Sequence, residues 1–322
     1  MRFCEFAKRV QEEAARICGE AYEVRIQEVR KNNGVTRTGL FLRKEEEPVG
    51  AVVYLDPYYR RWGRGKGEAP IGEVARLVCE AFPESGRQEI VAAEFYDFES
   101  LRHRIVYRLV SRERNEELLK EVPWVPFCDL AVVFAVVLRD SAEGCLTFLI
   151  YHQHVELWGT GVETVRRAAE ENTPRLLPCR FLSFEDLLQG SGGFSCLEGG
   201  ISGRAGKDRD PAGTSEEEPY YVLTNEKGVN GAAALLYDGV LREISDRFGR
   251  DLVLLPSSVH EVLVIPDKGD LRMEDLAAVV RMINETEVLE EDVLSDRVYR
   301  YRRETGTVTL ASGSERGLGE MA

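Results

Sequence analysis

The segment His152 to Glu156, with the sequence HQHVE, carries several side chains that could bind a metal ion or transfer protons. It closes a long apolar stretch that begins at Leu146, and that stretch predicts a buried β-strand. Side chains alternate between the two faces of a strand, so His152, His154 and Glu156 would line one face. Imidazole and carboxylate ligands of this kind suit zinc, manganese or non-haem iron.

The preceding strand decides which side chain faces His154. That strand, Leu130 to Leu138, is predicted to form a hairpin with the strand that ends in the HQHVE segment. In the register that pairs Arg139 with Gly144, Asp129 stands opposite His154. A carboxylate there would orient the imidazole and favour its charged form.

Two interpretations of this group remain open. A shift of one residue places Cys128 opposite His154, and its thiolate would be a soft metal ligand. In the structural interpretation, His154 and Asp129 form a hydrogen-bonded lock where a buried strand reaches solvent. In the chemical interpretation, His152, His154 and Glu156 hold a divalent metal with Asp129 in support. We predict no cofactor, with this metal as the alternative.

A second polar group lies at the tip of a later predicted hairpin, and its members are Ser257, Ser258, His260 and Glu261. Serine, histidine and a carboxylate are the parts of a hydrolytic triad, but a triad is defined by geometry and not by nearness in sequence. The chain has no Gly-x-Ser-x-Gly turn to expose a nucleophile. The alternative is a hairpin turn with a polar tip.

The run Tyr58 to Lys66 interleaves basic and aromatic residues, a composition that suits single-stranded nucleic acid or an acidic protein. Its glycines lack the spacing of a phosphate-binding loop. The alternative interpretation is a solvated surface loop.

Composition limits the classes of function. The chain has 322 residues, of which 43% are hydrophobic, and this is enough for one large or two ordinary domains. The net charge of -14 disfavours nucleic acid and anionic membranes as partners, and leaves a protein or a small ligand. No targeting segment and no membrane-spanning apolar run is evident. Seven cysteines without short paired spacings argue against a disulfide framework, so we expect core or surface thiols and a cytoplasmic location.

The periodicity of the apolar residues predicts an α+β protein of antiparallel β-hairpins, each followed by packing helices. An amphipathic helix opens the chain and ends near Gly19, and Asn32 to Gly34 predicts a hairpin turn. The segment rich in glycine, serine and charge predicts a flexible linker. We therefore predict a first α+β domain, the linker, a second α+β domain and a disordered tail, at residues 1–189, 190–219, 220–312 and 313–322.

The order of several short motifs resembles an uncharacterised bacterial family from Gram-positive organisms, domain-of-unknown-function family 5688. The motifs are Tyr22 to Gln27, Lys31 to Gly34, Pro126 to Ala131, His154 to Gly159, Asn172 to Pro178, Tyr221 to Asn225, Leu255 to Glu261 and Leu294 to Asp296. The resemblance covers nearly the whole chain, and the part from Trp158 onward is also distantly similar to another uncharacterised bacterial family. The resemblance implies a bacterial cytosolic setting and no particular reaction. Family members tend to be acidic and aromatic where Arg60, Arg61 and Arg64 stand, which argues against a shared nucleic-acid role.

These observations favour a binding or interaction protein without a catalytic signature. We expect its contacts to come from the ends of the two hairpins and from a turn at Asn172 to Arg175. One alternative is a metal-dependent hydrolase that uses the His-x-His-x-Glu site. Another is a regulator linked to phage or mobile elements, which would rest on the basic run.

Overall fold

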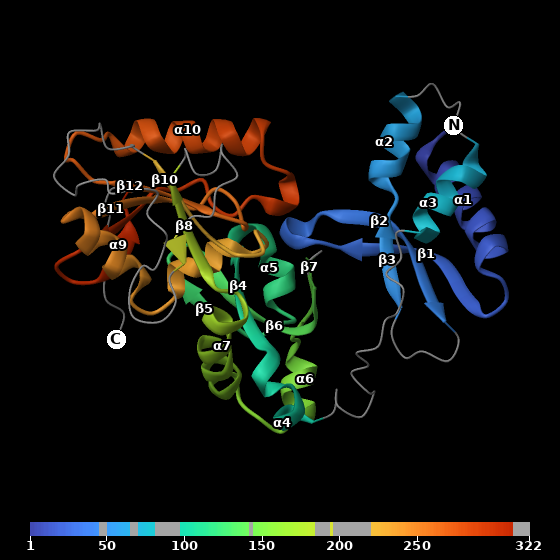
Figure 1. The fold of residues 1–322 in the computed structure, drawn as a ribbon, viewed down its shortest axis with the longest axis horizontal. Helices are drawn as coiled ribbons and strands as arrows, with labels where there is room; N and C mark the ends of the chain where they lie inside the picture. Colours follow the sequence, from blue (N-terminus) through green and yellow to red (C-terminus); the bar gives the residue numbers. More distant parts are fainter. Residues whose placement is uncertain are drawn as a thin grey trace. The chain divides into compact units, whose positions relative to one another are not determined.

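A computed structural model describes the chain in residues 1–44, 50–64, 70–80, 97–141, 144–183, 194–195 and 220–311. The chain divides into two compact units, Met1–Ala92 and Ala93–Ala322. Figure 1 shows the ribbon of both units. Each unit has its own sheets and helices, so each is described separately.

The first unit is a three-stranded antiparallel sheet with helices, in the sheet order β1-β2-β3. Its elements are α1 (Phe3–Cys18), β1 (Tyr22–Arg30), β2 (Thr36–Lys44), β3 (Ala51–Tyr54), α2 (Asp56–Arg64) and α3 (Ile71–Glu80). The predicted opening helix and the predicted turn at Asn32 to Gly34 are confirmed. Asn33 and Gly34 have positive φ angles there, as tight hairpin turns require.

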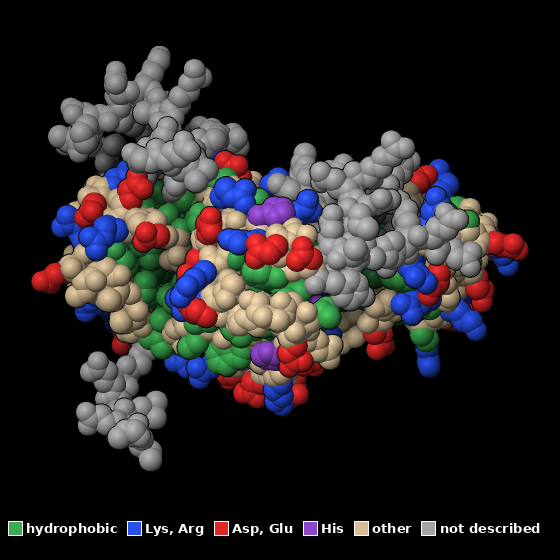
Figure 2. All heavy atoms as spheres, turned by 90° about the horizontal axis from the view of Figure 1, so that it is seen from below, with side chains coloured by type: hydrophobic (Ala, Val, Ile, Leu, Met, Phe, Trp, Pro, Cys, Tyr) green, Lys and Arg blue, Asp and Glu red, His purple; other side chains and the backbone are tan. Residues whose placement is uncertain are grey.

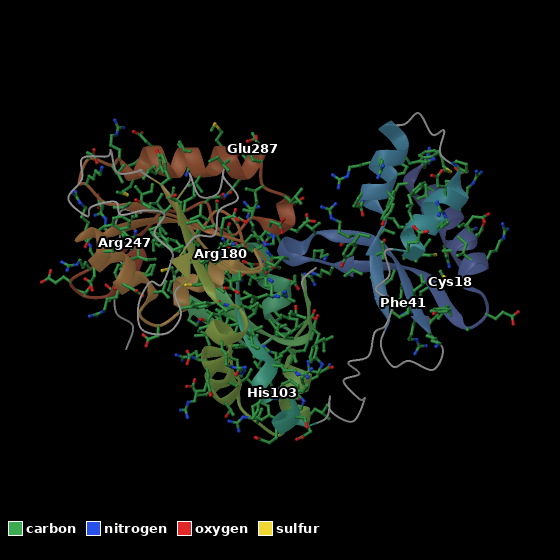
Figure 3. The ribbon with its side chains drawn as sticks, viewed as in Figure 1. Cys18, Phe41, His103, Arg180, Arg247 and Glu287 are labelled. Atoms are coloured by element: carbon green, nitrogen blue, oxygen red, sulfur yellow. The ribbon has the colours of Figure 1, made fainter. Side chains whose placement is uncertain are left out.

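The core of this unit lies between the helices and one face of the sheet. Phe6 and Val10 of α1 pack in one cluster with Leu40 and Leu42 of β2 and Val78 of α3. Phe41, which falls between the two leucines, belongs to the opposite face of the strand. Figure 3 labels Phe41 on β2 and Cys18 near the end of α1.

The second unit contains a four-stranded antiparallel sheet with a long central strand, β6. Its strands are β4 (Ile105–Ser111), β5 (Trp124–Phe127), β6 (Leu130–Ser141) and β7 (Gly144–Leu149). Around them lie α4 (Phe98–Leu101), the short 3-10 helices η3 (Arg102–Arg104) and η4 (Glu113–Asn115), α5 (Glu116–Leu119), α6 (His152–Leu157) and α7 (Val162–Leu176). Phe134 and Val136 of β6 are fully buried, as the apolar sequence of this strand predicts.

Strands β5 and β7 share one edge of β6, because β4 takes the other edge along residues 130–136. Strand β5 pairs from Leu130 to Val133, and β7 pairs from Ala135 to Ser141. Strand β7 ends at Leu149, and Ile150 makes one more hydrogen bond, to the Phe134 backbone oxygen at 2.9 Å, before the edge is taken by β5 at Val133. The predicted strand from Leu146 to Val155 is wrong beyond this point. The predicted register is also wrong, because Gly144 pairs with Ser141 and not with Arg139.

The second unit also contains a seven-stranded antiparallel sheet in the order β14-β13-β11-β12-β10-β8-β9. Its strands are β8 (Cys179–Ser183), β9 (Phe194–Ser195), β10 (Tyr221–Asn225), β11 (Leu252–Leu255), β12 (Val262–Pro266), β13 (Tyr299–Arg302) and β14 (Thr307–Leu310). Strands β8 and β10 pair along their length, with Arg180 of β8 opposite Thr224 of β10. Figure 3 labels Arg180 on its strand.

This pairing corrects the predicted domain boundary. The two strands that flank the glycine-rich segment belong to one sheet, and the division between compact units falls between Ala92 and Ala93. Residues 194–195, inside the predicted linker, form β9. The rest of the predicted linker and the predicted tail lie outside the described residues.

Helices pack on the seven-stranded sheet and connect it to the smaller one. Helix α10 (Met273–Thr286) buries Ala277 and Val280 against Val253 and Ile265 of the sheet. The 3-10 helix η5 (Gly231–Leu236), which precedes α9 (Val240–Phe248), contacts β10 and β12 of the large sheet and β4 of the smaller one. In Figure 1, α10 covers one side of the large sheet. Small buried residues in η5 let the two sheets approach closely.

The α+β class is confirmed, and each predicted hairpin is followed along the chain by helices. No helix among the described ranges is both long enough and apolar enough to cross a membrane. Cys4, Cys18, Cys79 and Cys128 carry free thiols, whereas Cys179 is disulfide-bonded, so the expectation of a thiol is wrong at Cys179. On the face drawn in Figure 2, acidic and basic side chains are interspersed.

Gly231 offers a test of how closely η5 is packed. A Cβ atom at this position would lie 2.2 Å from Thr224 Oγ1 and 2.4 Å from the backbone oxygen of His260. We expect Gly231→Ala to lower the free energy of unfolding of the second unit by about 1–3 kcal/mol, because backbone atoms must move. Urea denaturation of the full chain measures this change.

Gly161→Ser is the matched control, because no atom lies within 4 Å of the Cβ position at Gly161. Serine is also a good N-cap for α7, so this variant should be as stable as the wild type or slightly more stable. If the Gly231→Ala variant were as stable as the control, this would contradict the close packing around Gly231.

Candidate functional site

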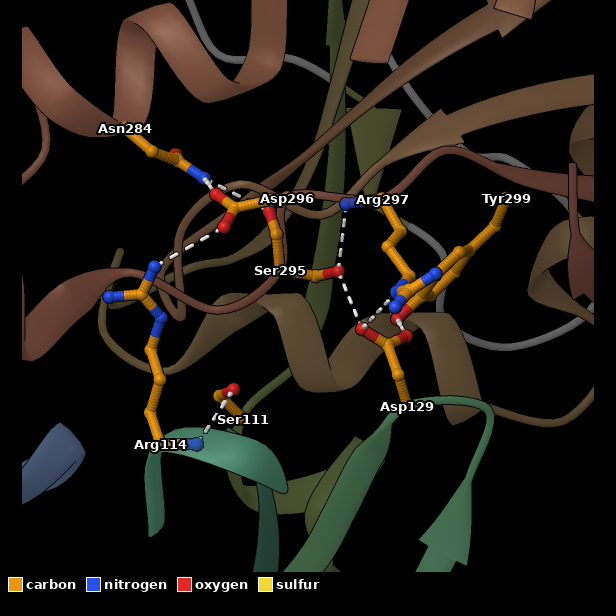
Figure 4. Close-up of polar contacts among 8 residues, drawn as sticks. All are labelled: Ser111, Arg114, Asp129, Asn284, Ser295, Asp296, Arg297 and Tyr299. Carbon is orange, nitrogen blue, oxygen red and sulfur yellow. Dashed lines mark hydrogen bonds and ion pairs between the residues drawn. The ribbon is translucent and has the colours of Figure 1, made fainter. Parts of the chain in front are cut away.

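Asp129 connects the two sheets of the second unit through its carboxylate. It lies in the turn between β5 and β6, where Cys128 adopts a positive φ of 52°. The Ser295 hydroxyl donates a hydrogen bond to Asp129 Oδ2 at 2.9 Å, and the Tyr299 hydroxyl donates to Oδ1. Arg297 Nε lies 3.8 Å from the same carboxylate. Figure 4 shows these contacts between the turn and the segment that leads into β13.

A second carboxylate, Asp296, extends the network toward α10 and the end of β4. Asn284 of α10 donates from Nδ2 to Asp296 Oδ1 at 2.7 Å and to the Ser295 backbone oxygen at 3.0 Å. Arg114 Nη2 donates to Asp296 Oδ2 at 3.2 Å. The segment Ser295 to Arg297 is therefore held from three directions, as Figure 4 shows.

The surroundings of the network keep the Tyr299 hydroxyl and the Cys128 thiol protonated. Burial raises the pKa of Tyr299 well above its ordinary value, and the negative charge of Asp129 raises it further. Burial and the same carboxylate raise the pKa of Cys128 to about 11. At neutral pH Tyr299 is thus a hydrogen-bond donor, and Cys128 is a thiol that is poorly suited to attack a substrate or to bind a metal.

A pocket of about 950 Å³ opens beside the network. One side comes from Ser111 to Lys120 with Trp124, and another from Ser295 to Arg297 with Asp129. Helix α10 contributes Glu274, Ala277 and Arg281, whose spacing places them along one side of the helix. The volume is in the range of known ligand pockets.

The pocket is charged, and several of its charges are unpaired. Arg114 and Arg297 form the ion pairs with Asp296 and Asp129. Within the described ranges, the guanidinium groups of Arg112 and Arg281 have neither an ion pair nor a hydrogen bond. The same holds for the carboxylates of three lining residues: Glu113, Glu116 and Glu274. These groups are available to a ligand that carries charges of both signs.

The described residues that line the pocket include no histidine and no cysteine. The hydroxyl of Ser295 already donates to Asp129 and accepts the Arg297 backbone N–H at 3.0 Å. Ser295 and its carboxylate neighbour are thus both engaged in the contact between the two sheets. The arrangement suits recognition of a ligand through charge-assisted hydrogen bonds.

The HQHVE segment forms helix α6, so the prediction of a strand there is wrong. On a helix, His152 and Glu156 lie on one face, and His154 is about 200° around the axis from His152. The three side chains therefore do not share a face. No group of three or more histidine, cysteine, aspartate or glutamate residues in the described part of the chain is arranged to hold a metal.

His154 has a local role instead of contacting Asp129. Its Nδ1 accepts the Tyr151 backbone N–H at 3.0 Å, and its ring stacks on Trp158 with a centroid separation of 5.9 Å. Burial lowers the pKa of His154, and the accepted hydrogen bond requires the neutral ring. The predicted hydrogen bond between His154 and Asp129 is therefore wrong, because Asp129 accepts hydrogen bonds from Ser295 and Tyr299.

The second candidate group forms a hydrogen-bonded turn. Ser258 Oγ accepts the His260 backbone N–H at 3.0 Å. His260 Nε2 lies 3.2 Å from Asp292, which raises the pKa of His260, and Nδ1 accepts the Asn230 N–H at 3.3 Å. Both ring nitrogens are thus occupied, and neither is directed to Ser257 or Ser258. Glu261 is exposed beside them. The structure favours the polar-turn interpretation.

Two further expectations are corrected by the structure. The basic run begins on helix α2 and not in a loop, and its Tyr59 and Trp62 pack against Phe6 in the core. These two rings are therefore not free to stack on bases. The expected turn at Asn172 to Arg175 lies inside α7, where buried Asn172 donates to the backbone oxygen of Arg102 at 2.7 Å.

A comparison with known families covers most of the chain. A family described as "Family of unknown function (DUF5688)" matches residues 3–303. The chain belongs to this family. No curated protein and no solved structure matches the chain.

The structure brings together two family motifs that lie far apart in the sequence. Pro126 to Ala131 supplies Asp129, and Leu294 to Asp296 supplies its partner Ser295. The motif Leu294 to Asp296 could therefore have indicated this site from the sequence. Arg114, Asn284 and Tyr299 were not expected, because nothing in their local sequence distinguishes them from surface or core residues.

Asp129→Ala tests the connection between the sheets. We expect the variant to lose about 2–4 kcal/mol of unfolding free energy, because the buried Tyr299 hydroxyl and the Ser295 hydroxyl lose their acceptor. In a Tyr299→Phe background the effect should be smaller, as a double-mutant cycle by urea denaturation would show. Asp238→Ala, at an exposed position, is the control. A change below about 0.5 kcal/mol for Asp129→Ala would contradict the connection.

The lowered pKa of His154 predicts that the free energy of unfolding depends on pH. Its pKa in the folded state is below the ordinary value of 6.5, so the unfolded chain binds more protons between these two values. The contribution of His154 is fully present above pH 6.5 and is lost as the pH falls through the lowered pKa. Urea denaturation of the wild type and of His154→Gln, compared from pH 7.5 down to pH 5, measures it.

The loss of stability with falling pH should be smaller in His154→Gln than in the wild type. His152→Gln, on the exposed side of the same helix, should keep the pH profile of the wild type. If the two variants have the same profile, the neutral ring of His154 does not contribute to stability.

Proposed function

We propose that the chain is a binding protein whose pocket in the second unit holds a mixed-charge peptide segment. The observation that carries this proposal is the presence of Arg112 and Arg281, which have no partner among the described residues, in a pocket of about 950 Å³. Guanidinium groups bind carboxylates with two parallel hydrogen bonds, and these are among the stronger polar contacts in proteins.

The acidic residues of the pocket define the other half of the ligand. Glu113, Glu116 and Glu274 are available to an ammonium or guanidinium group. The same carboxylates repel polyanions, so a polyphosphate or a nucleic-acid backbone is disfavoured. A peptide that carries both acidic and basic groups satisfies both sets of charges.

The stable side of the pocket supports recognition without large rearrangement. Ser295 and Asp296 are hydrogen-bonded to Asp129, Asn284 and Arg114 before any ligand arrives. Groups that are already ordered lose little conformational entropy on binding. Trp124, which is half-buried in the lining, offers an apolar surface next to the charges.

The alternatives fit the geometry less well. The ligand set expected for a metal-dependent hydrolase is divided between two faces of α6. The basic run expected for a nucleic-acid regulator has Tyr59 and Trp62 packed against the core. We therefore propose ligand binding without a bound metal and without nucleic acid as the main activity.

We also propose a bacterial setting in Gram-positive organisms and a cytoplasmic location. The bacterial setting follows from the family resemblance, and the location follows from the resemblance and from the spacing of the cysteines. The distant similarity of the part from Trp158 onward to a second bacterial family belongs to the same proposal. The disulfide at Cys179 does not add support to the location.

Binding can be measured with short synthetic peptides of eight residues that alternate glutamate and lysine, followed by tryptophan fluorescence. We expect saturable binding that weakens with added salt, because exposed charges are screened. Arg281→Ala should weaken the affinity about 10- to 100-fold, since charge-assisted hydrogen bonds contribute about 1.5–3 kcal/mol each. Arg112→Ala should act in the same direction.

Arg60→Ala is the control, because it removes an exposed arginine from the first unit, outside the pocket. In Trp124→Phe the change of tryptophan fluorescence on binding should be lost, while calorimetry still detects binding. Equal affinities of the Arg281→Ala variant, the Arg60→Ala variant and the wild type would contradict the proposed site.

A further inference from the structure

Two cysteines from different helices meet in the first unit. Cys18 is the last residue of α1, and Cys79 is in the last turn of α3. Their sulfur atoms are 3.6 Å apart, although 61 positions separate the residues in the sequence. A disulfide bond is about 2.05 Å long, so the two sulfurs must approach by only about 1.6 Å to form one.

The packing of α1 against α3 holds this pair together. Both side chains are half-buried at the margin of the core cluster that contains Phe6 and Val78. Gly19, which follows Cys18, has φ of 75° and no atom near its Cβ position. The end of α1 therefore has space to adjust when the sulfurs approach.

We propose that Cys18 and Cys79 are a site of reversible oxidation, at which a peroxide converts the two thiols to one disulfide. This modification is independent of the pocket in the second unit. Its consequence is a covalent link between the C-terminal ends of α1 and α3.

The reaction balances in two steps. The Cys18 thiolate attacks one oxygen of hydrogen peroxide, and Cys18 becomes a sulfenic acid as one water is released. The Cys79 sulfur then attacks the Cys18 sulfur, and its proton leaves with the hydroxyl group as a second water. Two thiols are oxidised and one peroxide is reduced.

The protonated state of Cys79 is consistent with its part in the second step. Burial raises the pKa of Cys79 to about 12, and the neighbouring Cys18 contributes to the shift. Cys79 therefore carries the proton that leaves with the hydroxyl group as water.

The experiment treats the reduced full chain with hydrogen peroxide, blocks the remaining thiols with iodoacetamide and maps the tryptic peptides by mass spectrometry. Cys18 lies in the peptide 17–25 and Cys79 in the peptide 77–87. We expect a joined peptide with the mass of the two minus two hydrogens, which disappears on treatment with dithiothreitol. The loop it closes should raise the melting temperature of the first unit by on the order of 10 °C.

Cys4→Ser is the control, because Cys4 is an exposed thiol on the same helix, and this variant should form the joined peptide as the wild type does. In Cys79→Ser, Cys18 should stop at the sulfenic acid, which dimedone labels. Recovery of both wild-type peptides in alkylated form after peroxide would overturn the proposal. Joining of Cys18 to a cysteine other than Cys79 would also overturn it.

Discussion

The carboxylate of Asp129 is the contact on which the candidate site depends. It lies in a tight turn of the four-stranded sheet and accepts hydrogen bonds from Ser295 and Tyr299, which belong to the segment entering the seven-stranded sheet. A half-buried carboxylate is stable only when hydrogen-bond donors replace its water, and these donors come from the other sheet. Both sheets must therefore be in place before the turn, the segment and the pocket beside them have a defined geometry.

The edge of β6 imposes a second constraint. A strand has two edges, and β4 occupies one of them, so β5 and β7 must divide the other. Because β5 pairs as far as Val133, β7 ends and the chain turns into α6 after Tyr151. This competition places the histidines on a helix and leaves the β5–β6 turn free to meet Ser295. The same pairing that places the histidines on a helix and not on a strand thus makes the contact of Asp129 possible.

The two units carry distinct chemical features. The second unit combines an ordered hydrogen-bond network with unpaired charges of both signs, which favours recognition of a charged ligand. The first unit places two thiols at the ends of packed helices, where a small movement of the sulfurs is sufficient to link them. The proposed binding and the proposed oxidation rest on separate residues and can be examined independently.

The sequence by itself determined the α+β class, the opening helix, the turn at Asn32 to Gly34 and the family. These features depend on local periodicity, turn residues and short motifs, all of which are readable along the chain. Only the tertiary structure decided that β7 ends at Leu149, that β8 and β10 join across the glycine-rich segment, and that Asp129 binds Ser295. The physical reason is that strand edges and hydrogen-bond partners are taken by competition among segments distant in sequence, and no local pattern records which segment is paired.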